Sequence, residues 1–161
     1  MRVIKLFKYH KMLIETLKTL FERDLRKLKA EIELYNSENA IWHIERNIPN
    51  SAGNLALHLV GNLNGFIGET LGHTGYVRQR ELEFSLRGIP KTELIRQIDE
   101  TIAVVNSSLD KLTLEDLAKE FPVPVFGGKT TSTEYMLVHL ASHLGYHLGQ
   151  VNYHRRILDE L

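Results

Sequence analysis

The sequence predicts an all-α protein, a four-helix bundle with long connections after its second and third helices. Apolar residues recur every three or four positions along four separate stretches, which is the period of a helix buried on one face. No stretch alternates apolar and polar residues convincingly, as a half-buried strand does. The β-rich phrase FPVPVFGG contains Pro122 and Pro124, which exclude a central strand. Four amphipathic helices bury their apolar faces best against one another.

The first helix is expected over residues 10–35. Its apolar face comprises Leu13, Leu17, Leu20, Phe21, Leu25, Leu28, Ile32 and Tyr35. The second is expected over residues 51–72, because Pro49 and Ser51 form a start signal and Gly72 an end signal.

The third helix follows Pro90 and is expected over residues 92–109, with a short helix over 114–121. The fourth opens near Thr131, whose spacing to Glu134 fits a capping box, and continues almost to Leu161. The connections that remain, residues 73–90 and 121–132, are long for a small bundle. Loops of this length are often functional, and we expect both to lie over one end of the bundle.

Composition restricts the class of protein. The 161 residues, 43% of them apolar, suit a single domain spanning residues 1–161. The 20 basic and 20 acidic residues balance, which argues against nucleic acid or an anionic membrane as partner. The absence of cysteine excludes disulfides, thiolate metal sites and a cysteine nucleophile. No signal peptide and no membrane span is evident, so we expect a cytoplasmic protein.

Histidines repeat along the predicted fourth helix. At 100° per residue, His139, His143, His147 and His154 fall within a sector about 80° wide, beside the apolar face. One ion can bind only a pair four residues apart, either His139 with His143 or His143 with His147. Gly145 and Gly149 flank His147 and leave room for a neighbouring helix or a ligand, which favours His143 with His147.

The predicted second helix offers a third ligand. Asn54, His58 and Asn62 follow one another at steps of four and form a polar stripe in an apolar helix, which Gly65 prolongs. Buried polar groups need partners, and a histidine that faces a metal, supported by amides, satisfies this need. His58, His143 and His147 would leave coordination positions open, as catalytic metal sites do. Neutral imidazoles suit zinc, nickel, copper or iron(II).

Other interpretations stay open on the residues alone. His58 is also a plausible hydrogen-bonded core residue, and the pair on the fourth helix a solvated stripe. We expect His139 to be packed near the site, His154 to lie on the surface or at an interface, and no metal role for His10, His43 and His73.

The phrase formed by His143, Tyr146, His147, Gly149 and Gln150, together with His58, resembles the DinB/YfiT-like superfamily of metal-dependent enzymes. The stretch from Trp42 to His58 is similar to that family's entry into the second helix. The resemblance implies a DinB-type bundle, usually dimeric, with a three-histidine site for a divalent metal, of which zinc and nickel are the first candidates. It also implies a hydrolase, or a transferase or isomerase that uses a low-molecular-weight thiol.

One position departs from that pattern, because Leu148 stands where the family often has arginine. The substrate or contact at this position therefore differs from that of many relatives. The sequence contains no HExxH or ExxH motif, which excludes a zinc-protease glutamate between the pair and a ferritin-like di-iron site. Groups near the site that could position a ligand are Tyr146, Gln150 and Tyr153 on the helix and Arg78, Arg80, Glu81 and Glu83 in the first long connection.

Three functions are therefore compared. The leading one is a metal-dependent enzyme that acts on a small molecule, as a hydrolase or a thiol-dependent transferase. The second is a helical protein that binds a metal or small ligand without catalysis. The third is an interaction module whose histidines are packed or solvated. Metal content and turnover distinguish the three.

Overall fold

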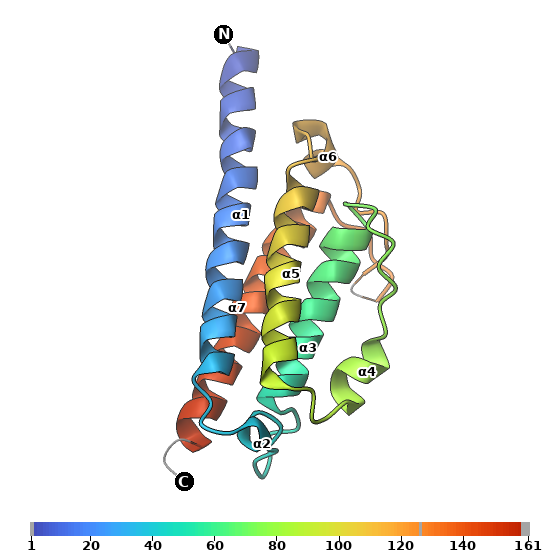
Figure 1. The fold of residues 1–161 in the computed structure, drawn as a ribbon. Coiled ribbons are helices and arrows are strands. Elements are labelled where there is room, and N and C mark those ends of the chain that lie inside the picture. The colour runs from blue at the N-terminus through green and yellow to red at the C-terminus, as the bar shows by residue number, and fades with distance from the viewer. Residues whose placement is uncertain (1, 126, 159–161) are drawn as a thin grey trace.

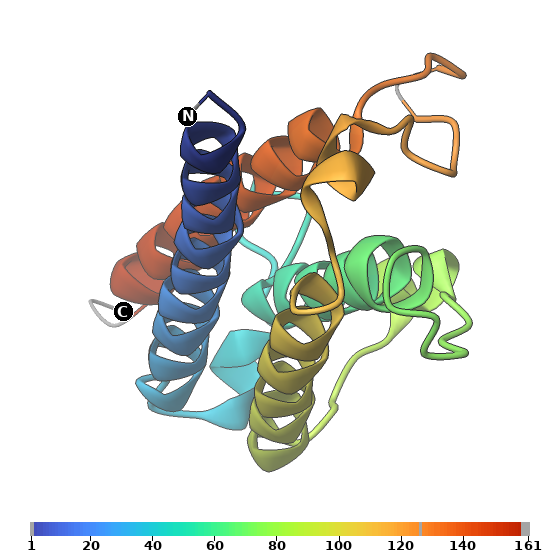
Figure 2. The ribbon, with the colours of Figure 1, turned by 90° about the horizontal axis from the view of Figure 1, so that it is seen from above.

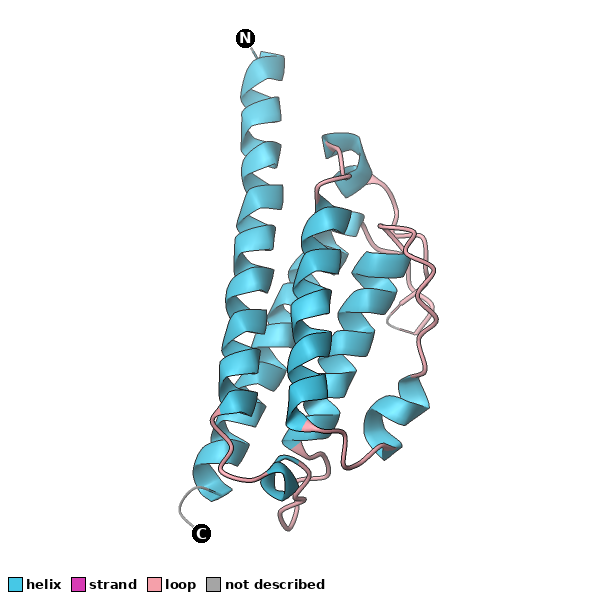
Figure 3. Cartoon of the chain, in the orientation of Figure 1, coloured by secondary structure: helices cyan, strands magenta, loops and turns pink. Residues whose placement is uncertain are grey.

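The protein is described by a computed structural model over residues 2–125 and 127–158, with the backbone alone for residues 2–11. Its elements are α1 (Arg2–Glu33), α2 (Glu38–Ile41), α3 (Ala52–Leu63), the π-helix η1 (Asn64–Glu69), α4 (Arg80–Ser85), α5 (Lys91–Leu109), α6 (Leu114–Ala118) and α7 (Thr133–Leu158). Figure 3 shows helices and loops alone, and this part of the chain contains only isolated β-bridges. The prediction of an all-α fold is confirmed.

The long helices α1, α3, α5 and α7 form the bundle (Figures 1 and 2). Each of α1 and α3 packs against both α5 and α7, so that α1 and α3 lie on opposite corners. Along the chain, α1 and α7 run in one direction, whereas α3 and α5 run in the other (Figure 1). The antiparallel contact between α3 and α7 is the one that brings His58 to the C-terminal histidines.

The core follows the predicted apolar faces. On α1, Phe21, Leu25 and Leu28 are fully buried, whereas Leu13 and Leu20 are only half-buried. Every residue of α3 is buried, because α5, α7 and α4 surround it. This burial explains why the polar residues of α3 need partners within the fold. None of the described helices is long and apolar enough to cross a bilayer.

The predicted start of α3 is confirmed, whereas the start of α7 lies one residue later than its capping signal predicts. Ser51 caps α3, and its hydroxyl accepts a hydrogen bond from the backbone N–H of Asn54. The expected capping box at Thr131 is wrong, because Ser132 accepts from the N–H of Tyr135 instead. Ser132 forms a β-bridge with Glu120, and the backbone N–H of the adjacent Thr133 donates to the Lys119 carbonyl. The capping residue is therefore Ser132, one residue after Thr131. Residues 159–161 lie outside the described part.

The first long connection contains a helix that its loop-like sequence did not predict. Residues 73–90 do not lie over one end of the bundle, as expected, but run back along the side of α3 and carry α4 against its lower half (Figure 1). Since α5 is parallel to α3, the chain must return along the full length of the bundle. This topology places the side chains of residues 78 and 83 beside His58.

Candidate metal centre

Three imidazole rings from two helices meet at one point. His58 comes from α3, and His143 and His147 come from successive turns of α7. Nε2 of His143 lies 3.3 Å from Nε2 of His58 and 3.1 Å from Nε2 of His147, and one ligand atom of each ring lies within 4.8 Å of the others. Two imidazole nitrogens bound to one ion at about 2.0–2.1 Å stand about 3.3 Å apart at tetrahedral angles. The spacing therefore matches that of a metal-binding triad.

The Nδ1 atoms of His58 and His147, which lie on the far side of each ring from the common point, contact side-chain oxygen atoms. Nδ1 of His58 lies 2.9 Å from Oε2 of Glu83, and Nδ1 of His147 lies 2.6 Å from Oε1 of Gln150. A carboxylate or an amide oxygen only accepts hydrogen bonds, so each Nδ1 must carry the proton. Neutral rings of this tautomer present an Nε2 lone pair toward the common point, as metal ligands do.

The cluster holds more acceptors than donors. If His143 carries its proton on Nε2, that single N–H can be shared by two acceptor nitrogens, but its Nδ1 is buried without a hydrogen-bond partner. If the proton lies on Nδ1, three lone pairs face one another, an arrangement that a cation relieves. The residues therefore fit a divalent metal.

The surroundings of His143 and His147 disfavour protonation of both rings. Burial, together with the neighbouring histidines, lowers the pKa of His143 to about 4. Burial also lowers the pKa of His147, although its hydrogen bond with Gln150 opposes this effect. A ligand histidine must be deprotonated, so both shifts prepare the site for a metal at neutral pH.

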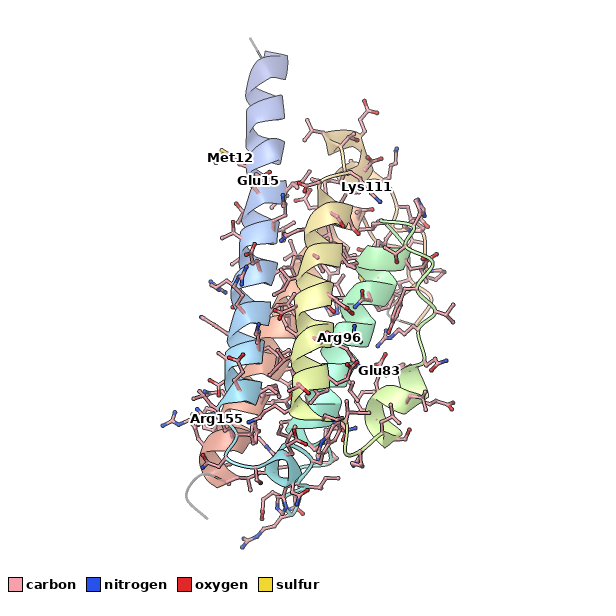
Figure 4. The ribbon with its side chains drawn as sticks, in the orientation of Figure 1. Met12, Glu15, Glu83, Arg96, Lys111 and Arg155 are labelled. Atoms are coloured by element: carbon pink, nitrogen blue, oxygen red, sulfur yellow. The ribbon has the colours of Figure 1, made fainter. Side chains whose placement is uncertain are left out.

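A buried carboxylate from α4 fixes His58. Burial raises the pKa of the Glu83 carboxyl, but the hydrogen bonds from Arg78 and His58 outweigh this effect and hold the pKa below its ordinary value. Arg78 donates to both oxygens of Glu83, over 2.6 and 2.8 Å, and its guanidinium lies over the Phe66 ring. Figure 4 labels Glu83 at the side of the bundle where α4 meets α3. The ionised Glu83 thus fixes the orientation of the His58 ring, as a carboxylate does behind a metal-binding histidine.

One amide of the polar stripe on α3 supports the segment behind His58. The Asn54 side-chain amide donates to the backbone carbonyls of Glu83 and Leu86, over 3.0 and 3.1 Å. These bonds tie both ends of the Glu83 turn to α3. Asn54 therefore positions the segment that positions His58.

Gly61 of α3 and Gly65 of η1 allow this close approach. A Cβ at Gly61 would overlap the Glu83 carboxylate and lie 2.8 Å from its Cδ, and a Cβ at Gly65 would lie 3.1 Å from Cδ of Arg78. By contrast, Gly145 and Gly149 meet no atom within 4 Å. No neighbouring helix of this chain fills the space at Gly145 and Gly149, so of the two alternatives only room for a ligand stays a prediction. The close approach occurs at Gly61 and Gly65 instead.

Alanine substitutions separate these two kinds of glycine. We expect Gly61→Ala to lower the free energy of unfolding by about 1–3 kcal/mol, since the methyl group displaces a buried carboxylate. Gly145→Ala should raise it by about 0.5–1 kcal/mol, because this helix position is open and glycine is a poor helix former. Urea denaturation of both variants measures this contrast. Equal shifts of one sign would contradict the packing described at Gly61.

The other histidines take separate roles. His139 is half-buried, and its ring stacks on His143 at 6.1 Å, as expected of a packed neighbour. The expectation of a surface or interface position for His154 is wrong: its Nε2 donates to the His43 carbonyl and its Nδ1 accepts from the Tyr35 hydroxyl, over 3.0 and 2.7 Å. Burial lowers the pKa of His154. His43 and His73 are exposed, and the side chain of His10 lies outside the described part.

The remaining candidates differ in their distance from the site. Tyr146 is exposed, and its ring contacts His147 at 5.1 Å between centroids, whereas Tyr153 lines a separate cavity. Arg80 and Glu81 are exposed on α4. Sequence reasoning considered Glu83 and Arg78 only as loop residues that could hold a ligand. Gly61 and Gly65, one turn apart beside His58, were the signal that a second segment approaches α3 here.

The fold and the site define a helical bundle with a three-histidine cluster. The chain belongs to the family described as Protein of unknown function (DUF1572), which matches residues 5–160. No curated protein matches it. The chain is similar to the crystal structure of a conserved protein from Enterococcus faecalis, with a TM-score of 0.71 over 91% of this chain and 97% of the other. At 14% identity this likeness shows a shared fold alone.

Proposed function

We propose that the protein is a metal-dependent enzyme that acts on a small molecule at a centre formed by His58, His143 and His147. The observation that carries this proposal is the convergence of three Nε2 atoms whose rings are held from behind by Glu83 and Gln150. A hydrogen-bonded core histidine needs one partner for each ring nitrogen. It does not need two further imidazoles at 3.1–3.3 Å from one atom.

The partial exposure of the cluster supports an open site. His58 is buried, whereas His143 and His147 are half-buried, so the cluster lies at the edge of the core. A divalent metal held by three imidazoles supplies a Lewis acid with open positions, which lowers the pKa of a water or thiol that binds there. Zinc and nickel fit three neutral nitrogen ligands.

The chain's own residues orient this centre. Glu83 accepts a hydrogen bond from Nδ1–H of His58 and so raises the basicity of the ring, while Arg78 balances the carboxylate charge. Gln150 fixes His147, and Tyr146 stands exposed beside that ring, where its hydroxyl can meet a ligand. These groups orient the histidines and contact the ligand, and none of them is assigned as the proton acceptor of the reaction.

A separate cavity, which shares Gln150 with the supports of the histidine cluster, suits the apolar part of a small molecule. It measures about 310 Å³ and has mainly apolar walls, formed by Ile48, Pro49, Asn50, Leu55, Gln150, Tyr153, His154 and Ile157. Gln150 belongs to both the cavity wall and the metal centre, because its amide oxygen accepts from His147. A ligand in the cavity would therefore touch the residue that orients a metal ligand.

The resemblance to the DinB/YfiT-like superfamily supports two reaction classes, hydrolysis and transfer to or from a low-molecular-weight thiol. We extend the proposal to a homodimer on the same ground, and to the cytoplasmic location expected from the sequence. The balanced charge of the chain supports a small-molecule partner over nucleic acid.

Turnover after metal removal tests the proposal. Protein treated with a chelator and then reloaded with zinc or nickel is assayed with nitrophenyl esters and with a small thiol plus an aryl chloride electrophile. We expect activity in one of these assays that chelation abolishes and metal restores. Tight metal binding without turnover in either assay would instead support a non-catalytic metal-binding protein.

A further inference from the structure

Two buried polar atoms without partners lie on the two helices that build the metal centre. In the part of the chain with described side chains, the buried atoms that lack a hydrogen bond are Asn62 Oδ1, Glu69 Oε2, Ser108 Oγ and His143 Nδ1. His143 is the middle ring of the proposed centre. Asn62 is only 7% exposed and lies one helical turn after His58 on the polar stripe of α3. A buried polar group that lacks a partner destabilises the fold, so both atoms require an explanation.

Asn62 lies on the face of α3 that contacts α7. At 100° per residue, its direction falls about 40° from that of His58 and about 20° from that of Leu55. His58 contacts the histidines of α7, and Leu55 shares a cavity wall with Gln150 and His154 of α7. Since Asn62 is between these two directions, its side chain faces α7 as well.

The helix directions place Asn62 on the His143 side of the centre. Because α3 and α7 are antiparallel (Figure 1), a step from His58 toward Asn62 corresponds on α7 to a step from His147 toward His143 and His139. Helical side chains also lean toward the N-terminus of their helix, which inclines the Asn62 amide toward His58. The unpaired oxygen and the unpaired nitrogen therefore lie in one region of the α3–α7 contact.

The chemistry of the two atoms is complementary. When Nε2 of a neutral histidine binds a metal, Nδ1 carries the proton and needs an acceptor. His58 has Glu83 and His147 has Gln150 for this purpose, but His143 has none. Asn62 Oδ1 is an acceptor without a donor.

We infer that Asn62 is a positioning residue whose Oδ1 accepts a hydrogen bond from Nδ1–H of His143 when a metal is bound, directly or through one water. This inference rests on the proposed metal centre and completes its outer hydrogen bonds. Each ligand then has its own hydrogen-bond acceptor: Glu83 of α4 for His58, Gln150 of α7 for His147 and Asn62 of α3 for His143.

The test compares cobalt(II) and zinc(II) affinity, measured by titration, in the wild type, Asn62→Leu and Asn62→Asp. Loss of the hydrogen-bond acceptor of a ligand histidine weakens metal binding about 10- to 100-fold, and we expect this loss for Asn62→Leu. Asn62→Asp keeps an acceptor oxygen and should bind at least as tightly as the wild type. Asn106→Leu, the same change on α5 away from the site, should leave the affinity unchanged.

Stability without metal separates positioning from ordinary packing. Asn62→Leu removes a buried unpaired oxygen at similar volume, so the melting temperature of the metal-free variant should equal or exceed that of the wild type. In the loaded wild type, the Nδ1 proton of His143 should give an NMR signal protected from exchange, which Asn62→Leu loses.

Two results would overturn the assignment. If Asn62→Leu binds metal as tightly as the wild type, Asn62 does not serve His143. If Asn62→Asp binds as weakly as Asn62→Leu, an acceptor oxygen is not what the site requires. If the wild type binds neither metal, the metal centre itself is rejected. This outcome differs from one in which the wild type binds metal and the Asn62 variants bind it equally well, which rejects only the role of Asn62.

Discussion

Replacement of His58 by alanine should abolish stable metal binding. His58 supplies the only α3 ligand of the proposed triad, and the pair on α7 cannot hold an ion with comparable affinity. The affinity should therefore fall by more than the about 10- to 100-fold that follows from loss of a ligand's hydrogen-bond partner. With free metal at about 100 times the dissociation constant, metal stabilises the wild type by about 2.7 kcal/mol. For a chain of this length, this raises the melting temperature by about 5–10 °C, and His58→Ala should lose that increase.

Thermal melts with and without zinc measure this effect, and His43→Ala provides the control. The His43 side chain is exposed and pairs with Glu45, away from the cluster, so its removal should leave the zinc-dependent increase intact. An undiminished increase in His58→Ala would show that zinc stabilises the fold from another place.

Replacement of Glu83 by alanine should affect both stability and metal binding. Removal of one partner of a buried ion pair leaves the other charge buried, at a cost of about 3–5 kcal/mol. Because 19% of the Arg78 side chain is exposed to solvent, we expect the smaller loss of about 2–4 kcal/mol. The metal affinity should fall about 10- to 100-fold, since His58 loses the acceptor that fixes its ring.

The control lies on the same short helix. Glu81 is exposed on α4, and Glu81→Ala should change the free energy of unfolding by less than about 0.5 kcal/mol. Glu83→Gln keeps the shape and an acceptor oxygen but removes the charge, so its effects should be intermediate. Denaturant titration and metal titration of the three variants test these expectations together. Equal stability of Glu83→Ala and Glu81→Ala would contradict the buried pair with Arg78.

The fold was predictable because its signals are local. Phe21, Leu25 and Leu28 recur at helical spacing, and Ser51 marks a helix start by side-chain chemistry that needs no tertiary partner. The cap of α7 depends on the bridge between Glu120 and Ser132, which is a contact between distant parts of the chain. Its position was therefore not evident from the spacing of Thr131 and Glu134.

The clustering of the three histidines was predictable, whereas the residues that support them were not. His143 and His147 share one face of one helix by periodicity, and His58 stands out in an apolar helix. Glu83 reaches His58 only because residues 73–90 return along α3, a path that follows from the parallel arrangement of α3 and α5. His154 has the same helical direction as the ligands, yet Tyr35 and the His43 carbonyl bind it instead. Helical direction therefore identified candidates, and packing between elements selected among them.

Elemental analysis of the protein, purified without a histidine tag, tests the central claim most directly. The account predicts about one zinc or nickel ion per chain, and none in a variant that carries alanine at residues 58, 143 and 147 but keeps its helical circular-dichroism spectrum. A wild-type protein that contains no metal and takes up neither zinc nor nickel from a defined buffer would contradict it.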